Sequence, residues 1–237
     1  MPCSRVVIIG DGAFGRAIAE RATARGIAVH RLLGRRDNVD GSGLTAATLD
    51  GVDVVIDAST ADAVPANVAA TMRAGVPMIV GATGWHDRLD VVREYVAQHH
   101  GALLHAANFA AGVLRFTHLL AEAARRFPRR AGYASALLDT HHAAKRDAPS
   151  GTARQLAAAI EGAVGTRPEI TSLRVGHVPG THELVLDGPY EQIRIVHEVR
   201  DRRLFADGAV DAASWLVETP RAGVFTLTDM LADEVPA

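Results

Sequence analysis

The sequence predicts an α/β fold: a Rossmann-type, doubly wound parallel sheet, followed by a smaller α+β domain with a mostly antiparallel sheet. Three observations predict it. In the first half, short apolar runs rich in Val and Ile alternate with helical stretches, which is the order of a parallel sheet covered by helices. A glycine-rich turn, residues 10–15, follows the first run. Beyond residue 107 the alternation stops, and two apolar runs joined by a short turn indicate a hairpin.

Five strands are expected in the first half. Their apolar runs are nearly continuous, as in strands that are buried on both faces. A connection rich in Gly, Ser, Thr and Asp spans residues 38–50. The expected strands are residues 5–9, 27–33, 52–59, 76–80 and 102–107, and the expected helices are residues 16–25, 61–75 and 85–100.

The second half begins with an expected helix over residues 113–127, which Pro128 ends. A strand over residues 134–138 and a helix over residues 153–160 flank a polar loop. Pro149 prevents an earlier start of that helix, and Ser150 or Thr152 is its expected N-cap. Further expected elements are a hairpin of residues 183–186 and 192–197 around Asp187-Gly188, a helix over residues 205–217 and a strand over residues 224–227. Two domains follow from this change of pattern.

The glycine-rich turn has the sequence Gly10-Asp11-Gly12-Ala13-Phe14-Gly15 and lies between a strand and a helix. In that context the glycines allow a tight turn and bring the backbone close to a dinucleotide pyrophosphate at the helix N-terminus. The alternative is a glycine turn of another α/β protein.

The end of the second strand predicts which nicotinamide cofactor is preferred. An NAD-specific site places an acidic residue there, whereas this chain has Arg35 and Arg36. Two guanidinium groups suit a 2′-phosphate, so NADPH is expected to serve at least as well as NADH. The alternative is a solvated basic loop, with Asp37 reaching the ribose.

Composition excludes several classes of protein. A formal net charge of −2 gives no electrostatic case for binding nucleic acid or an anionic membrane. The single cysteine, Cys3, excludes an internal disulfide framework, and no set of metal ligands at usable spacing is apparent. No apolar run is long enough to span a bilayer, and the first strand begins too early to leave room for a signal peptide. A cytoplasmic protein without membrane attachment is expected.

The polar loop is the stretch with the most chemistry. His141, His142 and Lys145 precede the Pro149-Ser150-Gly151-Thr152 turn that opens a helix. A helix N-terminus beside these cations is suited to binding a carboxylate, and His or a shifted Lys can deliver a proton near neutral pH. The alternative is a polar surface loop whose histidines serve packing.

Several segments of the chain resemble the 4-hydroxy-tetrahydrodipicolinate reductase family. Besides the glycine turn, they are Gly81-Ala82-Thr83-Gly84, residues 107–112, the His-His-x-x-Lys loop and residues 197–209. The resemblance implies NAD(P)H-dependent reduction of 4-hydroxy-tetrahydrodipicolinate to tetrahydrodipicolinate in lysine and diaminopimelate biosynthesis, by a homotetramer. It also implies a dinucleotide-binding domain over residues 1–107, to which residues 206–237 return, and a substrate and oligomerisation domain over residues 108–205.

The resemblance also implies roles for single residues. His141 and Lys145 match the proton donors, and His142, Ser150, Gly151 and Thr152 match contacts to a dicarboxylate substrate. With the two arginines, the residues expected to bind the cofactor are Gly10, Asp11, Gly12, Ala13, Phe14, Gly15, Arg35, Arg36, Gly81, Ala82, Thr83, Ala106, Ala107, Asn108, Phe109, Arg202 and Phe205.

The chain departs from the commoner family pattern in three places. The glycine turn is one residue shorter, Ala82 replaces the usual Thr, and the segment between residues 162 and 183 is shorter. The shortened segment and Ala82 favour a second interpretation, a relative that reduces another cyclic imine or carbonyl acid. A third is a non-catalytic NAD(P)-binding sensor; the intact His141 and Lys145 argue against it, because a sensor needs no proton donor.

Overall fold

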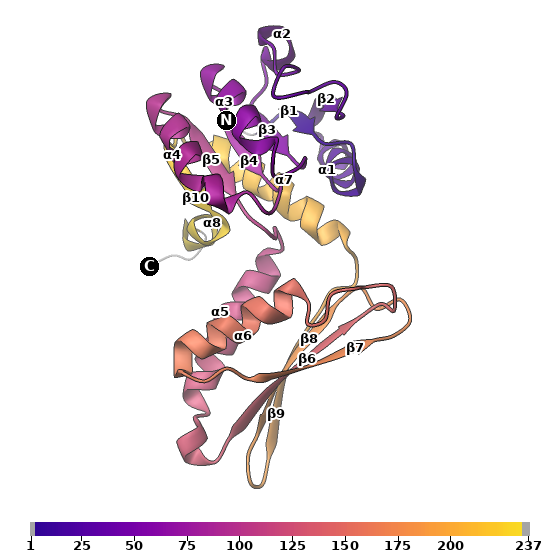
Figure 1. The fold of residues 1–237 in the computed structure, drawn as a ribbon, viewed down its shortest axis with the longest axis vertical. Coiled ribbons are helices and arrows are strands. Elements are labelled where there is room, and N and C mark those ends of the chain that lie inside the picture. Colours follow the sequence, from indigo (N-terminus) through magenta and orange to yellow (C-terminus); the bar gives the residue numbers. More distant parts are fainter. Residues whose placement is uncertain (1–2, 234–237) are drawn as a thin grey trace. The chain divides into compact units, whose positions relative to one another are not determined.

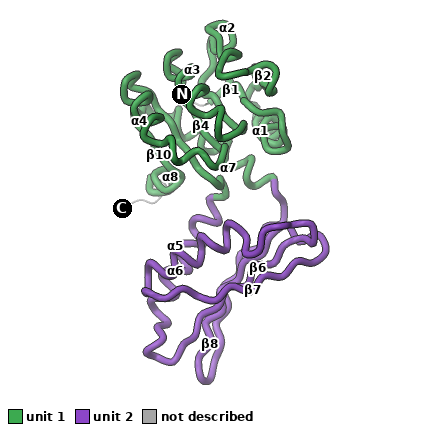
Figure 2. The backbone as a smooth tube through the Cα atoms, in the orientation of Figure 1, with its two compact units in different colours: residues 1–110, 203–237 green, residues 111–202 purple. Residues whose placement is uncertain are grey.

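The computed structural model describes residues 3–233 and divides them into two compact units (Figure 2). One consists of residues 3–110 and 203–233, and the other of residues 111–202. Of the C-terminal segment expected to return to the first domain, residues 234–237 lie outside the described residues. Within the described part, no helix is long and apolar enough to cross a membrane.

The first unit is built on a six-stranded sheet in which every pair of neighbours is parallel (Figure 1). Its order is β10-β5-β4-β3-β1-β2, so the direction of winding reverses between β1 and β3. The predicted Rossmann-type sheet is confirmed. Its strands are β1 (Arg5–Ile9), β2 (Ala28–Leu33), β3 (Val54–Asp57), β4 (Met78–Val80), β5 (Ala102–His105) and β10 (Gly223–Thr226).

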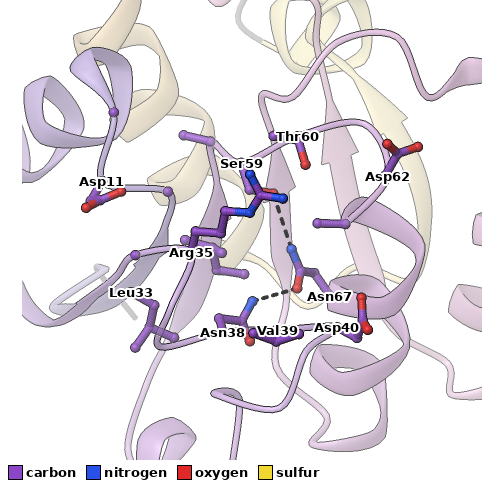
Figure 3. A pocket seen from close by; sticks show the side chains of 16 residues that line it. Asp11, Leu33, Arg35, Asn38, Val39, Asp40, Ser59, Thr60, Asp62 and Asn67 are labelled. Atoms are coloured by element: carbon purple, nitrogen blue, oxygen red, sulfur yellow. Dashed lines mark hydrogen bonds between the residues drawn. The ribbon is translucent and has the colours of Figure 1, made fainter.

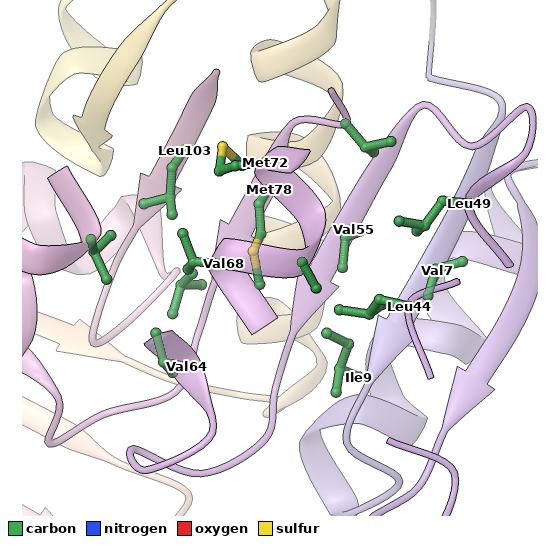
Figure 4. Close-up of a cluster of buried hydrophobic side chains, with 14 of the residues drawn as sticks. Val7, Ile9, Leu44, Leu49, Val55, Val64, Val68, Met72, Met78 and Leu103 are labelled. Carbon is green, nitrogen blue, oxygen red and sulfur yellow. The ribbon is translucent and has the colours of Figure 1, made fainter. Parts of the chain in front are cut away.

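Helices cover both faces of this sheet, which explains why its apolar runs are continuous. On one face Val7, Val55 and Met78 pack with Val68 and Val96 of two helices, α3 and α4 (Figure 4). Two further helices, α1 and α7, contact the strands as well as each other. The helices of this unit are α1 (Ala13–Ala24), α2 (Ala46–Leu49), α3 (Val64–Arg73), the 3-10 helix η1 (His86–Arg88), α4 (Leu89–Gln98), α7 (Arg203–Glu218) and α8 (Leu227–Asp233).

Two helices of the first unit were not expected. Helix α2 lies in the segment predicted to be a connection, where the Thr45 hydroxyl caps it by accepting the Thr48 N–H. Helix α8 begins at Leu227, which was predicted to end a strand. The Asp229 carboxylate accepts hydrogen bonds from the N–H and hydroxyl of Thr226, which turns the chain into the helix at this point.

The second unit is a four-stranded mixed sheet with two helices packed on one face (Figure 1). Its order is β7-β6-β8-β9; β6 and β7 are parallel and the other two pairs are antiparallel, so the predicted mostly antiparallel sheet is confirmed. Its elements are α5 (Ala111–Arg126), the 3-10 helix η2 (Arg129–Ala131), β6 (Ala134–His141), α6 (Gly151–Val164), β7 (Glu169–Arg174), β8 (Thr181–Asp187) and β9 (Gln192–Glu198).

Strand β6 is longer than predicted. The expected strand ended at Leu138, but pairing with β7 continues to His141 and pairing with β8 to Thr140. Because side chains alternate along a strand, Leu137, Asp139 and His141 all point to the face that carries the helices. His141 therefore ends a strand and does not belong to a flexible loop.

The register aligns one row of polar residues across all four strands. Asp139 of β6 lies opposite Ser172 of β7 and His182 of β8, and His182 lies opposite His197 of β9. This row lies next to the apolar core, in which Leu184 is fully buried between the sheet and the helices. The sheet therefore presents polar groups next to the N-terminal end of α6.

We expect Leu184→Ala to lower the free energy of unfolding of the second unit by about 2–5 kcal/mol, since it leaves a cavity in a closed core. Urea denaturation followed by circular dichroism measures the change. The matched control is Leu119→Ala on α5, where the side chain is 53% exposed and the cost should stay within about 0.5 kcal/mol. Equal losses in the two variants would contradict the assignment of the core.

Candidate active site

The first unit has an open pocket of about 460 Å³ at the carboxyl ends of β1, β2 and β3 (Figure 3). The pocket lies where the direction of winding reverses, which is where open α/β sheets bind nucleotides. Of the residues expected to bind the cofactor, Gly10, Asp11, Gly12 and Arg35 line it.

The glycine turn brings the backbones of two strands into close contact. Gly10 has a φ of +100°, and a Cβ atom there would lie 2.5 Å from the carbonyl oxygen of Ala58. A Cβ atom on Gly15 would lie 1.8 Å from the carbonyl oxygen of Gly10. Only glycine fits either position, and helix α1 consequently begins at the floor of the pocket, directly after Gly12.

The basic residues after β2 differ in their positions. Arg35 lines the pocket, whereas Arg36 is exposed and is not among the lining residues. Asp37 accepts a hydrogen bond from the Gly34 N–H, at 2.8 Å. Asp37, the acidic residue that could bind a ribose hydroxyl, therefore already accepts a hydrogen bond within its own turn.

A chain of buried hydrogen bonds supports the wall of the pocket, and Figure 3 shows its bond between Asn38 and Asn67. Asn38 donates to Asn67 at 2.7 Å, and Asn67 donates to the carboxylate of Asp57 at 2.9 Å. The Ser59 N–H also donates to Asp57, at 2.8 Å. Burial raises the pKa of Asp57, against the effect of these hydrogen bonds. The chain joins the ends of β2 and β3 through α3.

The other expected cofactor residues of this unit follow neighbouring strands. Gly81, Ala82 and Thr83 follow β4, and Ala106 to Phe109 follow β5. The rings of Phe14 and Phe109 stack with centroids 6.5 Å apart, and a Cβ atom on Gly81 would contact both. Phe205 is half-buried on α7. Arg202 is exposed and belongs to the second unit.

In the second unit, the end of β6 and the start of α6 hold the polar loop. The Val175 N–H donates to the carbonyl oxygen of His141, and the Ala143 N–H donates to that of Gly176. The Nζ atom of Lys145 lies 2.7 Å from the carboxylate of Asp147, and the lysine side chain is 24% exposed. Lys145 is thus a partly exposed cation on a tethered loop.

Ser150 is the N-cap of α6: its hydroxyl accepts the N–H of Ala153 at 3.0 Å. Gly151 and Thr152 therefore occupy the first turn, where N–H groups have no partner within the helix. These two residues were expected to contact a substrate carboxylate. A helix N-terminus of this kind favours an anion.

Asp139 contacts more groups of the site than any residue expected from the sequence. Its Oδ2 atom accepts hydrogen bonds from the Ser150 N–H at 2.9 Å, the Ser172 hydroxyl at 3.1 Å and Arg174 at 2.9 Å. Its Oδ1 atom lies 2.9 Å from Nδ1 of His141 and 3.4 Å from Nε2 of His182. The side chain is fully buried.

These contacts set the charges in the site. Burial opposes ionisation of Asp139, but hydrogen bonds from the Ser150 N–H and Arg174 hold its pKa well below the ordinary value. Burial lowers the pKa of His141, and that of His182 to about 4, with Asp139 offsetting only part of the effect. At neutral pH the site therefore contains an ionised carboxylate and two neutral imidazoles.

Asp139, Arg174 and His182 were not among the residues expected to form the site, although residues 172–176 and 180–183 resemble a run of the family. The alternation of β6 could have indicated Asp139, which lies two residues before His141 and hence on the same face. Arg174 and His182 come from other strands, so their proximity depends on the register. Asp139, His141 and His182 also offer metal-ligand atoms within 4.8 Å of one another, a grouping that sequence spacing did not reveal. The Arg174 guanidinium already supplies positive charge to this carboxylate.

Comparisons with known proteins identify the family of the chain. The family model described as dihydrodipicolinate reductase, N-terminus, matches residues 4–109, and the one described as dihydrodipicolinate reductase, C-terminus, matches residues 112–231. Dipicolinate-bound dihydrodipicolinate reductase from Paenisporosarcina sp. TG-14 has a similar fold: the TM-score is 0.78 at 19% identity, over 94% of this chain and 97% of that one.

Two curated relatives are similar in sequence. The 4-hydroxy-tetrahydrodipicolinate reductase of Gluconobacter oxydans is 38% identical over 78% of this chain and 80% of its own length. That of Haloarcula marismortui is 35% identical over 90% of this chain and 94% of its own length. The chain belongs to the 4-hydroxy-tetrahydrodipicolinate reductase family of NAD(P)H-dependent oxidoreductases.

Proposed function

We propose that this chain reduces 4-hydroxy-tetrahydrodipicolinate to tetrahydrodipicolinate with NAD(P)H, the reductive step of lysine and diaminopimelate biosynthesis. The observation that carries the proposal is that His141, at the end of β6, and Lys145, in the polar loop, precede the N-terminus of α6 in a chain whose two halves both match the family. The name of the Paenisporosarcina relative, which is bound to dipicolinate, supports a planar dicarboxylate as ligand.

The two units divide the work in this proposal. The first holds the nucleotide at Gly10–Gly15 and Arg35, with residues 81–83 and 106–109 toward the nicotinamide; Arg36, Arg202 and Phe205 complete the proposed cofactor contacts. The cofactor, when bound, supplies the hydride. The second unit binds the dicarboxylate through the Gly151 and Thr152 N–H groups, His142 and Ser150, and supplies one proton.

We assign that proton to Lys145. Burial lowers the pKa of His141, so its imidazole is neutral near pH 7 and is not a reservoir of protons. Lys145 carries three N–H donors on a loop that reaches solvent, and its partner Asp147 is exposed. His141 then contacts the substrate or Lys145 as a neutral hydrogen-bonding group.

The shortened segment does not favour the two alternative functions, reduction of another imine and a non-catalytic sensor. Between α6 and β8 the chain still completes β7, and Arg174 and Ser172 of that strand reach Asp139. A shorter connection has therefore kept the groups that surround the polar loop, and no observation favours another imine substrate or a sensor.

We propose a homotetramer in the cytoplasm, assembled through the face of the second sheet that carries no helix. Leu173 of β7 and Val196 of β9 point to that face and are 54% and 52% exposed, and Leu138 and Val185 lie between them, half-buried. Polar side chains such as Glu183 and Arg194 share this face, and exposed apolar side chains among them are typical of a surface that a second copy covers.

The test of the reaction follows absorbance at 340 nm with purified protein. The preceding synthase generates the substrate in situ from pyruvate and aspartate semialdehyde, and NADPH and NADH are compared in parallel. Synthase-dependent oxidation of either cofactor is expected. Oxidation that does not depend on the synthase, or none in protein that binds NADPH, would refute the proposed reaction.

Lys145→Ala should lower kcat by about 10²–10⁴-fold, the range that general acid–base groups contribute, while the dissociation constant for NADPH stays unchanged. The matched control is Arg146→Ala, which removes the neighbouring exposed cation and should keep kcat near that of the wild type. Steady-state kinetics and fluorescence titration measure the two quantities. A normal kcat in Lys145→Ala would remove this lysine from the mechanism.

Arg35→Ala with Arg36→Ala should raise KM for NADPH by about 10–100-fold and leave KM for NADH nearly unchanged, because only NADPH carries a 2′-phosphate for charged hydrogen bonds. Arg31→Ala, on the exposed side of β2 and outside the pocket lining, is the control. If both cofactors lose affinity equally, the two arginines do not read the phosphate.

The oligomer is tested by size-exclusion chromatography with light scattering. The wild type should elute with four times the mass of the chain, and Leu173→Asp with Val196→Asp should dissociate it, since it places charge on the proposed interface. Val91→Asp on α4, where the side chain is 49% exposed, is the control and should not change the mass. A monomeric wild type would exclude the tetramer.

A further inference from the structure

We infer that Asp139 is a positioning residue of the active site: its carboxylate fixes the tautomer of His141 and, through the same side chain, the start of helix α6. The inference rests on the proposed function, because His141 and the first turn of α6 matter only if the polar loop binds the substrate. It adds a residue that touches neither substrate nor cofactor and acts through the two parts of the site that do.

The Oδ2 side of Asp139 is committed to donors. The Ser150 N–H, the Ser172 hydroxyl and Arg174 all donate to this one oxygen, at 2.9–3.1 Å. Arg174 also donates to the carbonyl oxygens of Asp139 and Asp147. The oxygen thereby joins the N-cap of α6 to strand β7, so a group that can only accept must occupy the Oδ2 position.

The Oδ1 side faces two histidine rings. His141 Nδ1 lies 2.9 Å away and His182 Nε2 lies 3.4 Å away, and the two rings meet edge to face with centroids 5.3 Å apart. Among residues 3–233, neither Oδ1 nor His141 Nδ1 makes an aligned hydrogen bond, either to the other or to a third group, so their contact is a short but imperfectly aligned one. Catalytic hydrogen bonds are often imperfectly aligned before substrate binds.

An ionised carboxylate oxygen accepts and cannot donate, so it stabilises the form of His141 that carries hydrogen on Nδ1. His182 Nε2 is also within hydrogen-bond distance of the Ser150 hydroxyl, at 3.3 Å, so Asp139 alone does not set the tautomer of that ring. Hydrogen bonds hold the pKa of Asp139 well below its ordinary value, so the group is ionised at neutral pH. For neutral His141 this selects the Nδ1–H tautomer and leaves Nε2 as an acceptor. Nε2 lies beside Gly180, where a Cβ atom would approach it to 3.1 Å.

The isosteric change Asp139→Asn separates this role from packing. The three donors on the Oδ2 side require the amide oxygen there, which turns the amide NH₂ group toward the two rings. His141 then faces a donor at Nδ1 and must carry its hydrogen on Nε2. The shape of the side chain is kept, while the acceptor that the inference assigns to Asp139 becomes a donor.

The first measurement reads the tautomer of His141 directly, and its decisive result comes from the wild type. Solid-state NMR of protein labelled with ¹⁵N-histidine distinguishes the two neutral tautomers by the shifts of their ring nitrogens, and the signals missing in His141→Gln identify His141. We expect Nδ1–H in the wild type and Nε2–H in Asp139→Asn. A wild-type His141 with hydrogen on Nε2 overturns the inference, whether or not Asp139→Asn folds.

The second measurement is kinetic. Asp139→Asn should lower kcat by about 100-fold or more, the scale of a misplaced acid–base group, with an unchanged dissociation constant for NADPH. Asp187→Asn makes the same substitution at the exposed end of β8 and should retain wild-type kinetics. A folded Asp139→Asn with normal kcat refutes the positioning role.

The two measurements distinguish this inference from the proposed function. If the wild type does not reduce the lysine-pathway substrate, the proposed reaction fails, yet the tautomer of His141 is still read directly. If the wild type is active and the tautomer does not respond to Asp139→Asn, the reaction stands and the inference fails.

Discussion

The second unit depends on one buried carboxylate. Asp139 receives hydrogen bonds from the first residue before α6 and from β7, and it faces histidines of β6 and β8. Burying an unpaired charge would cost several kcal/mol, so this arrangement is stable only while its partners are in place. The register of three strands and the start of helix α6 are consequently tied to one side chain, and the polar loop connects β6 to that helix.

The first unit depends on a different constraint, the close approach of backbones at the glycine turn. Gly10 and Gly15 leave no room for a Cβ atom, and this lets α1 begin directly above the sheet. The buried hydrogen bonds from Asn38 through Asn67 to Asp57 form one wall of the pocket and connect the segments that follow β2 and β3. In this unit, steric exclusion at two glycines and buried hydrogen bonds hold the pocket in place.

Hydrophobic periodicity and the positions of Gly and Pro predicted the alternating first half, the hairpin, and where the glycine-rich turn and the polar loop lie in the chain. These patterns are local properties of the sequence. They failed at Asp139, Thr140 and His141, where polar residues interrupt an apolar run but the ladder to β7 and β8 continues. The positions of Arg174 and His182 next to Asp139 could not be predicted, because they depend on the register between strands that are distant in the sequence. Helix α8 was missed because one side chain, Asp229, decides where β10 stops.

The order of the strands has a consequence for synthesis on the ribosome. Strand β10, which completes the first sheet beside β5, is formed by residues 223–226, after the whole second unit has been made. Until those residues emerge, β5 is an exposed edge with unpaired N–H and C=O groups, the kind of edge on which chains aggregate. The nascent chain must therefore complete one compact unit while the other still lacks its last strand.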